Sequence, residues 1–210
     1  MSAGRVSREW LLLAGWAAAV VMGFAYAWSY SLRPGQASTA RAWPRDTGLS
    51  RGDEPTLVMF VEPDCPCSMA SLNELNLLLQ DRRNKVRAHI VFEPSAEAAA
   101  DVSQTALYKR AMQVGVAVHI DTDSRERQRF DAHTSGVTQL YDSEGDLLYQ
   151  GGITPARGHE GDNVGRRILA GFLQKDPEVL ARPRPMSAPV YGCHFDMQPN
   201  AARERSAEEN

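Results

Sequence analysis

Two closely spaced cysteines carry the most evident chemistry in this sequence. Cys65 and Cys67 enclose Pro66, after an apolar run and before leucines at helical spacing. A thiolate at the start of a helix is stabilised by unpaired backbone N–H groups and by the helix dipole, which lower its pKa. Pro66 suits the first turn of a helix, where N–H groups lack partners in any case. The acidic neighbours Glu62 and Asp64 oppose ionisation of the Cys65 thiol. We interpret Cys65 as a candidate redox or metal-binding thiol rather than an inert buried cysteine.

The surrounding sequence predicts an α/β fold. Thr56–Val61 is a short apolar run with β-branched residues, as in a buried strand. Apolar runs and helical periodicities then alternate, which predicts a mixed sheet with helices on both faces. Residues 142–146 read as a hairpin turn, and Asp162 or Asn163 as the N-cap of the last helix. We expect strands over residues 56–61, 86–92, 116–120, 137–141 and 147–150, and helices over residues 69–82, 101–114, 124–131 and 164–173.

Four stretches within residues 56–174 resemble the thioredoxin-like superfamily, and most of all its membrane-anchored periplasmic branch, which includes thiol–disulfide proteins of cytochrome maturation. They are Phe60 five residues before Cys65, Ile120-Asp121, residues 139–145, and Tyr149-Gln150-Gly151-Gly152. More narrowly, residues 151–154, 157–163 and 189–193 look like RedB-type redox proteins. The resemblance implies a thioredoxin-like mixed sheet flanked by helices, with Cys65 at the attacking position.

The sequence departs from the pattern of this superfamily in two places. The superfamily usually has Cys-x-x-Cys at the helix start, whereas here Ser68 occupies the position of the second cysteine and Cys67 lies inside the motif. The superfamily also has a cis-proline before the hairpin strand, whereas residues 134–138 contain no proline. Because cis bonds are rare at other residues, we expect trans bonds there. Substrate docking of the usual kind is therefore not implied.

Three redox arrangements of the cysteines remain open. Cys65 could pair with Cys67, in a small ring that disulfide geometry restrains. It could pair instead with Cys193, in the distant C-terminal segment. It could also act alone, with Ser68 leaving a mixed disulfide unresolved. Connectivity cannot be read from sequence, so Cys65, Cys67 and Cys193 are all candidate catalytic residues.

A metal site is the alternative chemistry for the same motif. Two cysteines with a histidine can bind copper(I) or zinc. In thioredoxin-like folds the end of the hairpin lies beside the cysteine motif, and Gly151 and Gly152 would allow a close backbone approach. We therefore consider Cys65, Cys67 and His159 as copper ligands, with His159 alternatively a base. Cys193, His194 and Met197 form a second possible soft site.

The N-terminal part of the chain predicts a membrane span. No charged residue occurs from Trp10 to Leu32, and a helix of about 20 residues crosses a bilayer. Aromatic residues lie at both ends of this run, as in interfacial belts. We expect an uncleaved signal anchor in a bacterial inner membrane, with the domain in the periplasm. A signal peptide cleaved near the small residues Ser38-Thr39-Ala40 is the competing interpretation, but cleavable signals usually have an apolar core of about 7–15 residues, and this run is longer.

Length and composition bound the organisation of the chain and its function. We expect a cytoplasmic tail at residues 1–9, a transmembrane anchor at 10–32, a linker at 33–55, a thioredoxin-like domain at 56–180 and a Pro-rich extension with a polar tail at 181–210. The 210 residues carry three cysteines and a net charge of −3. Nucleic-acid-binding proteins are usually strongly basic, so we expect no such partner. The function that we predict is thiol–disulfide exchange on protein thiols or disulfides, without a cofactor. Copper binding and a non-catalytic interaction module are the alternatives.

Overall fold

The computed structural model describes residues 8–94 and 101–195. The chain divides into two compact units, residues 1–33 and 34–210. The first unit contains helix α1 (Arg8–Ser31), whose 24 residues are all exposed or half-exposed. Within the described residues, α1 is the one helix that by length and composition could cross a membrane. It is a candidate transmembrane span, as the sequence predicted.

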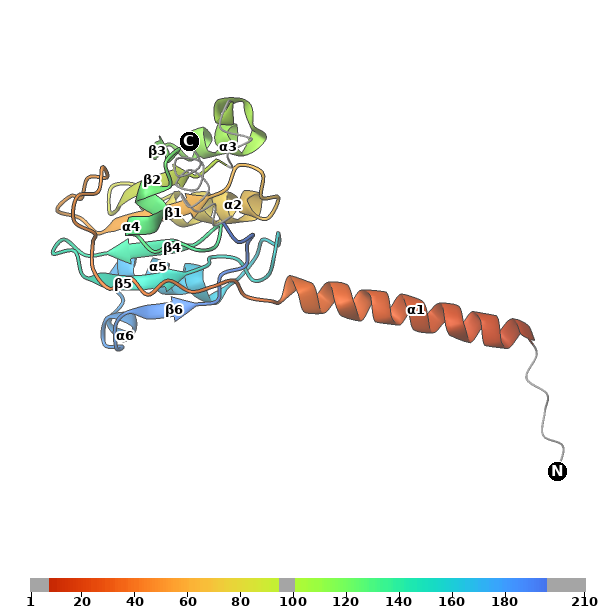
Figure 1. Ribbon diagram of the computed structural model, residues 1–210. Helices are drawn as coiled ribbons and strands as arrows, with labels where there is room; N and C mark the ends of the chain where they lie inside the picture. The colour runs from red at the N-terminus through yellow and green to blue at the C-terminus, as the bar shows by residue number, and fades with distance from the viewer. Residues whose placement is uncertain (1–7, 95–100, 196–210) are drawn as a thin grey trace, which may run out of the picture. The chain divides into compact units, whose positions relative to one another are not determined.

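The second unit is built on a six-stranded mixed sheet in the order β3-β2-β1-β4-β5-β6, which runs from top to bottom in Figure 1. Strands β1, β2 and β3 are parallel, β4 is antiparallel to β1 and β5, and β6 is parallel to β5. The strands are β1 (Thr56–Val61), β2 (Arg87–Phe92), β3 (Ala117–Ile120), β4 (Thr138–Tyr141), β5 (Leu147–Gly151) and β6 (Met186–Ala188). The fold is thioredoxin-like, as expected from the sequence.

Helices cover both faces of the sheet. Figure 1 shows α4 in front of the sheet and α5 behind it. The helices of this unit are α2 (Ser68–Leu79), α3 (Ala106–Val114), α4 (Arg125–Arg129), α5 (Val164–Gln174) and α6 (Pro177–Leu180), with a short 3-10 turn η1 (Val102–Gln104) before α3. Asn163 caps α5 by accepting a hydrogen bond from the N–H of Arg166, which confirms one of the two expected caps.

Strand β1 is buried on both faces, which explains its unbroken apolar sequence. Leu57, Met59 and Val61 face the core under α2, α3 and α5. Val58 and Phe60 face a second core on the side of α4. Because side chains alternate along a strand, a wholly apolar strand needs cover on both of its faces.

Residues 34–55 supply part of that cover, although the sequence predicted a linker at 33–55. Leu49 is buried in the second core, and Trp43 packs against Phe130 and Tyr141 at ring-centroid distances of 5.1 and 5.2 Å. The N–H of Gly35 donates to the carbonyl of Val190. This segment therefore belongs to the folded unit.

The segment after Leu180 also differs from the prediction, which placed only an extended tail there. Its residues 186–188 form the edge strand β6, and Val190 and Phe195 are buried in the second core. Helix α6 and the 3-10 turn were not predicted, and α2 ends at Leu79 instead of continuing to 82. The sheet thus extends beyond the expected boundary at residue 180.

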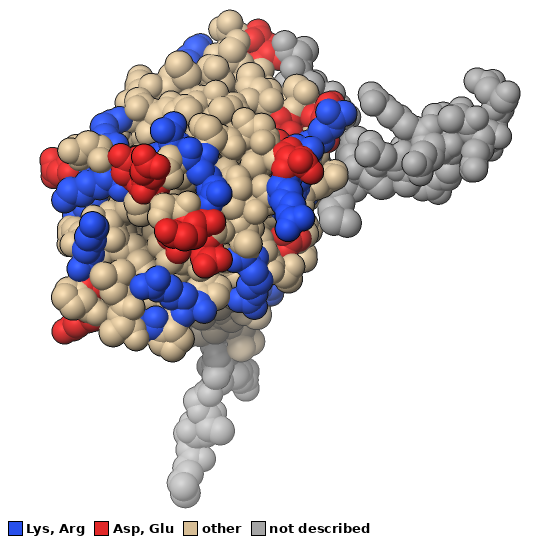
Figure 2. Space-filling model, turned by 90° about the vertical axis from the view of Figure 1, so that its left-hand side faces the viewer, with Lys and Arg blue, Asp and Glu red and all other residues tan. Residues whose placement is uncertain are grey.

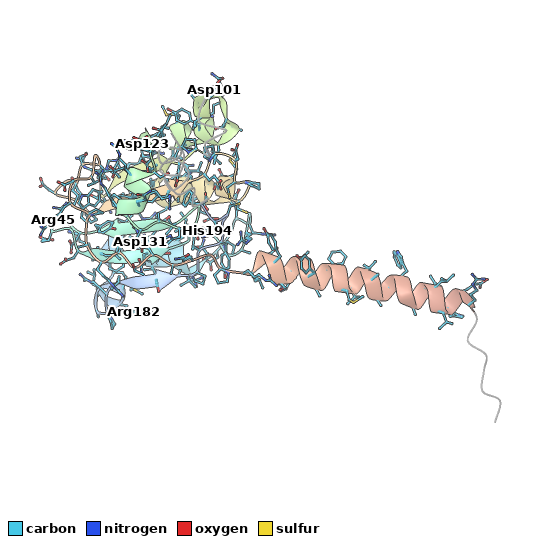
Figure 3. The ribbon with its side chains drawn as sticks, in the orientation of Figure 1. Arg45, Asp101, Asp123, Asp131, Arg182 and His194 are labelled. Atoms are coloured by element: carbon cyan, nitrogen blue, oxygen red, sulfur yellow. The ribbon has the colours of Figure 1, made fainter. Side chains whose placement is uncertain are left out.

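The end of the sheet near Arg45 carries charges of both signs. Figure 2 shows this end, with basic and acidic side chains interspersed over its surface. His194 lies at the opposite end of the sheet in Figure 3. Cys193 precedes His194, so the cysteines lie at the end opposite to Arg45.

Candidate functional site

Cys65 and Cys67 lie in the turn between β1 and α2. The N–H of Cys65 donates to the carbonyl of Glu62, and the N–H of Ser68 donates to the carbonyl of Cys65. Helix α2 begins at Ser68, with Cys67 at its N-cap position. Cys67 therefore precedes the helix by one residue, and Cys65 precedes it by three. Buried β1 fixes the start of this turn, and the buried side of α2 fixes its end.

Cys193 reaches the same place from the C-terminal segment. The N–H of Ser135 donates to the carbonyl of Cys193 at 2.8 Å, and the N–H of Phe195 donates to the carbonyl of His133 at 3.0 Å. Residues 193–195 thus run beside residues 133–135. Gly192 permits this approach, because a Cβ there would overlap the carbonyl oxygen of Ser135.

The three sulfurs form one cluster at this point. The Sγ atoms of Cys65 and Cys193 are 2.7 Å apart, and both are free thiols. The Sγ atoms of Cys65, Cys67 and Cys193 all lie within 4.8 Å of one another. Cys65 is buried, with 3% of its surface exposed, whereas Cys67 and Cys193 are half-buried. The three cysteines that sequence analysis gave as candidate catalytic residues therefore lie together.

The three thiols of the cluster differ in the direction of their pKa shifts. Burial opposes ionisation of Cys65, but hydrogen bonds from the Cys193 thiol, the Ser68 hydroxyl and nearby backbone N–H groups outweigh it and lower the pKa of Cys65. Burial raises the pKa of Cys193, and so does its role as donor to Cys65. Burial and the charge of Cys65 also raise the pKa of Cys67, although Arg157 opposes this. Cys65 is therefore the first thiol to ionise.

Two serines connect the parts of the site. Ser68 Oγ lies 2.6 Å from Ser135 Oγ, and the N–H of Glu62 donates to Ser135 Oγ at 2.8 Å. Ser135 thereby links the turn that carries Cys65 to the segment that carries Cys193. Sequence analysis did not predict this role for Ser135, whose only signal was its place in the region where the superfamily has a cis-proline.

The peptide bonds of residues 134–138 are trans, as expected without a proline. Within the described residues, the cis bond is that between Arg184 and Pro185. The backbone of residues 133–135 instead forms hydrogen bonds with the backbone of the C-terminal segment, at Cys193 and Phe195. A segment of the same chain therefore covers this strip of backbone.

His159 does not lie in the thiol cluster, contrary to the ligand set predicted from the sequence. Its side chain is exposed, and its Nδ1 lies 2.7 Å from the carbonyl oxygen of Arg157. The residue of this loop that lies beside the cluster is Arg157, which donates to the carbonyl of Gly192 and whose charge partly opposes the rise in the pKa of Cys67. Gly151 and Gly152 do permit a close approach, but of residues 188–191 rather than of the loop.

Glu74 holds this loop in place from helix α2. Its carboxylate is fully buried, accepts from the N–H of Gly161 at 2.6 Å and lies 2.7 Å from Nε of Arg166. Because an unpaired buried carboxylate is costly, these partners constrain the loop that carries Arg157.

The second soft site predicted from the sequence is only partly described. His194 is exposed, and its Nδ1 lies 2.6 Å from the carbonyl oxygen of His133. The histidine is absent from the group formed by Cys193 and the other two thiols. Met197 lies outside the described residues. The described geometry therefore favours the three-thiol group.

Comparisons with known proteins indicate the fold. No protein-family profile matches the chain, and no curated protein matches it. An uncharacterised conserved protein from Geobacillus kaustophilus is 20% identical, with a TM-score of 0.56 over 80% of this chain and 93% of the other. A hypothetical protein from Sinorhizobium meliloti 1021 is 19% identical, with a TM-score of 0.55 over 78% and 94%. A solution structure described as a thioredoxin-like protein in the oxidised form is 15% identical, with a TM-score of 0.46 over 67% and 95%. At such identities the likeness concerns the fold alone.

Proposed function

We propose that this protein is a membrane-tethered thiol–disulfide redox protein that acts outside the cytoplasm on protein thiols or disulfides. The observation that carries the proposal is the separation of 2.7 Å between Cys65 Sγ and Cys193 Sγ on a thioredoxin-like fold. The pair has a low-pKa member and a high-pKa member, which suits exchange chemistry. Cys65 and Cys193 are the exchanging pair in this proposal.

Exposure assigns different roles to the two sulfurs. Cys65 is 3% exposed, so a protein thiol cannot readily reach its sulfur, whereas Cys193 is half-buried. A thiol of lower pKa is also the better leaving group in exchange. An incoming thiolate therefore attacks Cys193 Sγ, and Cys65 leaves as a thiolate. Cys65 remains the internal nucleophile that re-forms the bond in the reverse direction.

The exchange with a substrate dithiol proceeds in two steps. First, a substrate thiol loses its proton to solvent, its sulfur bonds to Cys193 Sγ, and the bond between Cys193 and Cys65 breaks. Second, the other substrate sulfur attacks the substrate sulfur of this mixed disulfide, and Cys193 leaves and takes up the remaining proton. Two electrons pass from the substrate dithiol to the pair, and the substrate becomes a disulfide. The reverse steps reduce a substrate disulfide.

Peptide mapping after a thiol challenge tests this assignment. The full chain, oxidised in mild detergent, is treated with excess glutathione, quenched with iodoacetamide and mapped by mass spectrometry. We expect a linkage of Cys65 to Cys193 before treatment, and afterwards glutathione on Cys193 and alkylation on Cys65. Glutathione on Cys65 would reverse the roles. A linkage of Cys65 to Cys67 instead would refute this pairing, and if no disulfide forms among the three cysteines, the redox function is wrong and a non-catalytic interaction module is favoured.

His159→Ala provides a matched control for that experiment. The ring is exposed and lies outside the thiol cluster, so the variant should give the same linkage and the same glutathione adduct as the wild type. A changed adduct pattern would mean that the loop histidine takes part in exchange, which would contradict the proposed roles.

Helix α1 supports the membrane part of the proposal. Its 24 residues extend over about 36 Å, enough for a hydrocarbon core of about 30 Å. Its large apolar side chains are exposed, for example Trp10 at 67% and Phe24 at 74%, and a bilayer would remove them from water. Alkaline phosphatase fused after Asn210 should be active if the second unit faces the periplasm, and an inactive but intact fusion would refute this topology.

A further inference from the structure

One thiol of the cluster has no part in the proposed exchange. The disulfide uses Cys65 and Cys193, yet Cys67 Sγ lies within 4.8 Å of both. We propose that, in the reduced protein, Cys65, Cys67 and Cys193 bind one Cu(I) ion as a three-thiolate site. This inference concerns the reduced state only and does not depend on exchange with a substrate.

The positions of the sulfurs suit a three-coordinate metal ion. A metal–thiolate bond of about 2.3 Å places the sulfurs of a planar trigonal site about 4 Å apart. All three separations here are at most 4.8 Å. The sulfurs of Cys65 and Cys193, now 2.7 Å apart, must separate by about 1.3 Å to reach that spacing. The half-buried Cys193 lies beyond the last described strand, where a side-chain rotation can supply this movement.

The donor set selects the metal. Soft thiolates favour Cu(I) and zinc over harder ions. Structural zinc requires four ligands, and within the described residues no histidine, aspartate or glutamate joins the three cysteines in the group. Three thiolates without a fourth donor therefore favour Cu(I).

One cation near the cluster, the guanidinium of Arg157, favours the ion-bound form. Three thiolates and one Cu(I) leave a net charge of −2, which an adjacent cation stabilises. The guanidinium of Arg157 acts in this way on Cys67, and its bond to the carbonyl of Gly192 fixes it near Cys193. Glu62 acts in the opposite direction on Cys193.

The metal and the disulfide exclude each other. Formation of the Cys65–Cys193 bond uses two of the three donor sulfurs, and the two electrons pass to the substrate disulfide while copper remains Cu(I). The oxidised protein then retains Cys67 alone as a thiolate donor in this cluster. Bound Cu(I) in turn withholds Cys65 and Cys193 from exchange. The redox state of the pair thus sets the affinity for the metal.

The test is an anaerobic competition titration of the full, reduced chain in mild detergent, with Cu(I) and a chromophoric Cu(I) chelator. We expect one Cu(I) per chain and three Cu–S contacts by X-ray absorption. Cys67→Ser should weaken binding by at least about 10–100-fold, the loss that follows even from removal of outer-shell partners. His159→Ala is the matched control and should bind as the wild type does.

Two outcomes would overturn the inference. Equal affinity of the wild type and Cys67→Ser would mean that bound copper is adventitious, and a loss of affinity in His159→Ala would favour a histidine site. The oxidised wild type requires no variant and should lose the tight site. Because the titration needs no substrate, a protein that forms the Cys65–Cys193 linkage but binds no Cu(I) refutes only this inference. A protein that binds Cu(I) but forms no linkage refutes only the redox function.

Discussion

Replacement of Gly192 by alanine tests the link between the C-terminal segment and the reactive thiol. A Cβ at this position would overlap the carbonyl oxygen of Ser135 and lie 2.9 Å from its carbonyl carbon. Relaxation of the second contact alone to an ordinary separation of 3.4 Å requires about 0.5 Å of movement, and the oxygen requires more. Both contacts are with backbone, so the C-terminal segment must move away.

The movement weakens two hydrogen bonds and partly exposes Phe195, which is buried in the second core. The bond from the N–H of Ser135 to the carbonyl of Cys193 is 2.8 Å long, and Arg157 donates to the carbonyl of Gly192. Each is worth about 1 kcal/mol net, and partial exposure of Phe195 adds to this loss, so we expect about 2–3 kcal/mol of destabilisation. The Cys65–Cys193 separation should also increase, so the linkage should be populated less in a given redox buffer.

The assay combines urea unfolding of the second unit in the full chain with quantitative peptide mapping in a glutathione buffer. Gly48→Ala is a matched control, because its Cβ would meet only Glu126 Oε1 at an ordinary 3.6 Å. The reasoning is refuted if Gly192→Ala unfolds at the urea concentration of the wild type and forms the Cys65–Cys193 linkage to the same extent.

Four further predictions concern stability and pH. Oxidation closes a loop of 128 residues, so the oxidised protein should be about 5 kcal/mol more stable to urea than the reduced one, and equal stabilities would contradict this pairing. Ser68→Ala removes a donor to Cys65 and should raise the pKa of that thiol, which moves the pH profile of its alkylation rate upward. Glu74→Gln removes the buried charge that pairs with Arg166, and chemical denaturation should show a loss of about 2–3 kcal/mol. Burial lowers the pKa of both His89 and His119, so the unfolded chain binds more protons as the pH falls below about 6.5. The free energy of unfolding should therefore decrease as the pH falls below about 6.5. His89→Gln should make this pH dependence of stability shallower, as measured by urea unfolding at a series of pH values.

Much of the sheet could be predicted because each strand is indicated by the pattern of apolar residues within its own short stretch of sequence. Every residue from Leu57 to Val61 is apolar, and a strand buried on both faces needs this pattern. The cover of the second core could not be predicted in the same way. Trp43 and Phe195 are isolated aromatic residues in polar stretches, so neither periodicity nor propensity reveals what they contact.

The candidate site shows the same division. Cys65 was identifiable because its neighbours in sequence create its environment, namely the end of β1 and the start of α2. The arrangement of Cys193 beside it depends on contacts between residues 133–135 and 193–195, more than fifty residues apart, for which a single sequence carries no signal. His159 was chosen from the expected position of the hairpin, but the loop turns its histidine outward and places Arg157 near the thiols.

The separation of Cys65 and Cys193 along the sequence also means that the two thiols become available at different times during synthesis. A ribosome makes Cys65 128 residues before Cys193, so the growing chain offers Cys65 only Cys67 as a nearby thiol. The geometry that favours Cys193 arises only after β6 has joined the sheet and residues 193–195 have docked beside 133–135. In the proposed exchange, oxidation of this pair therefore requires that synthesis has passed residue 193 and that residues 193–195 have docked, and a chain truncated before residue 193 would leave Cys65 without its proposed partner.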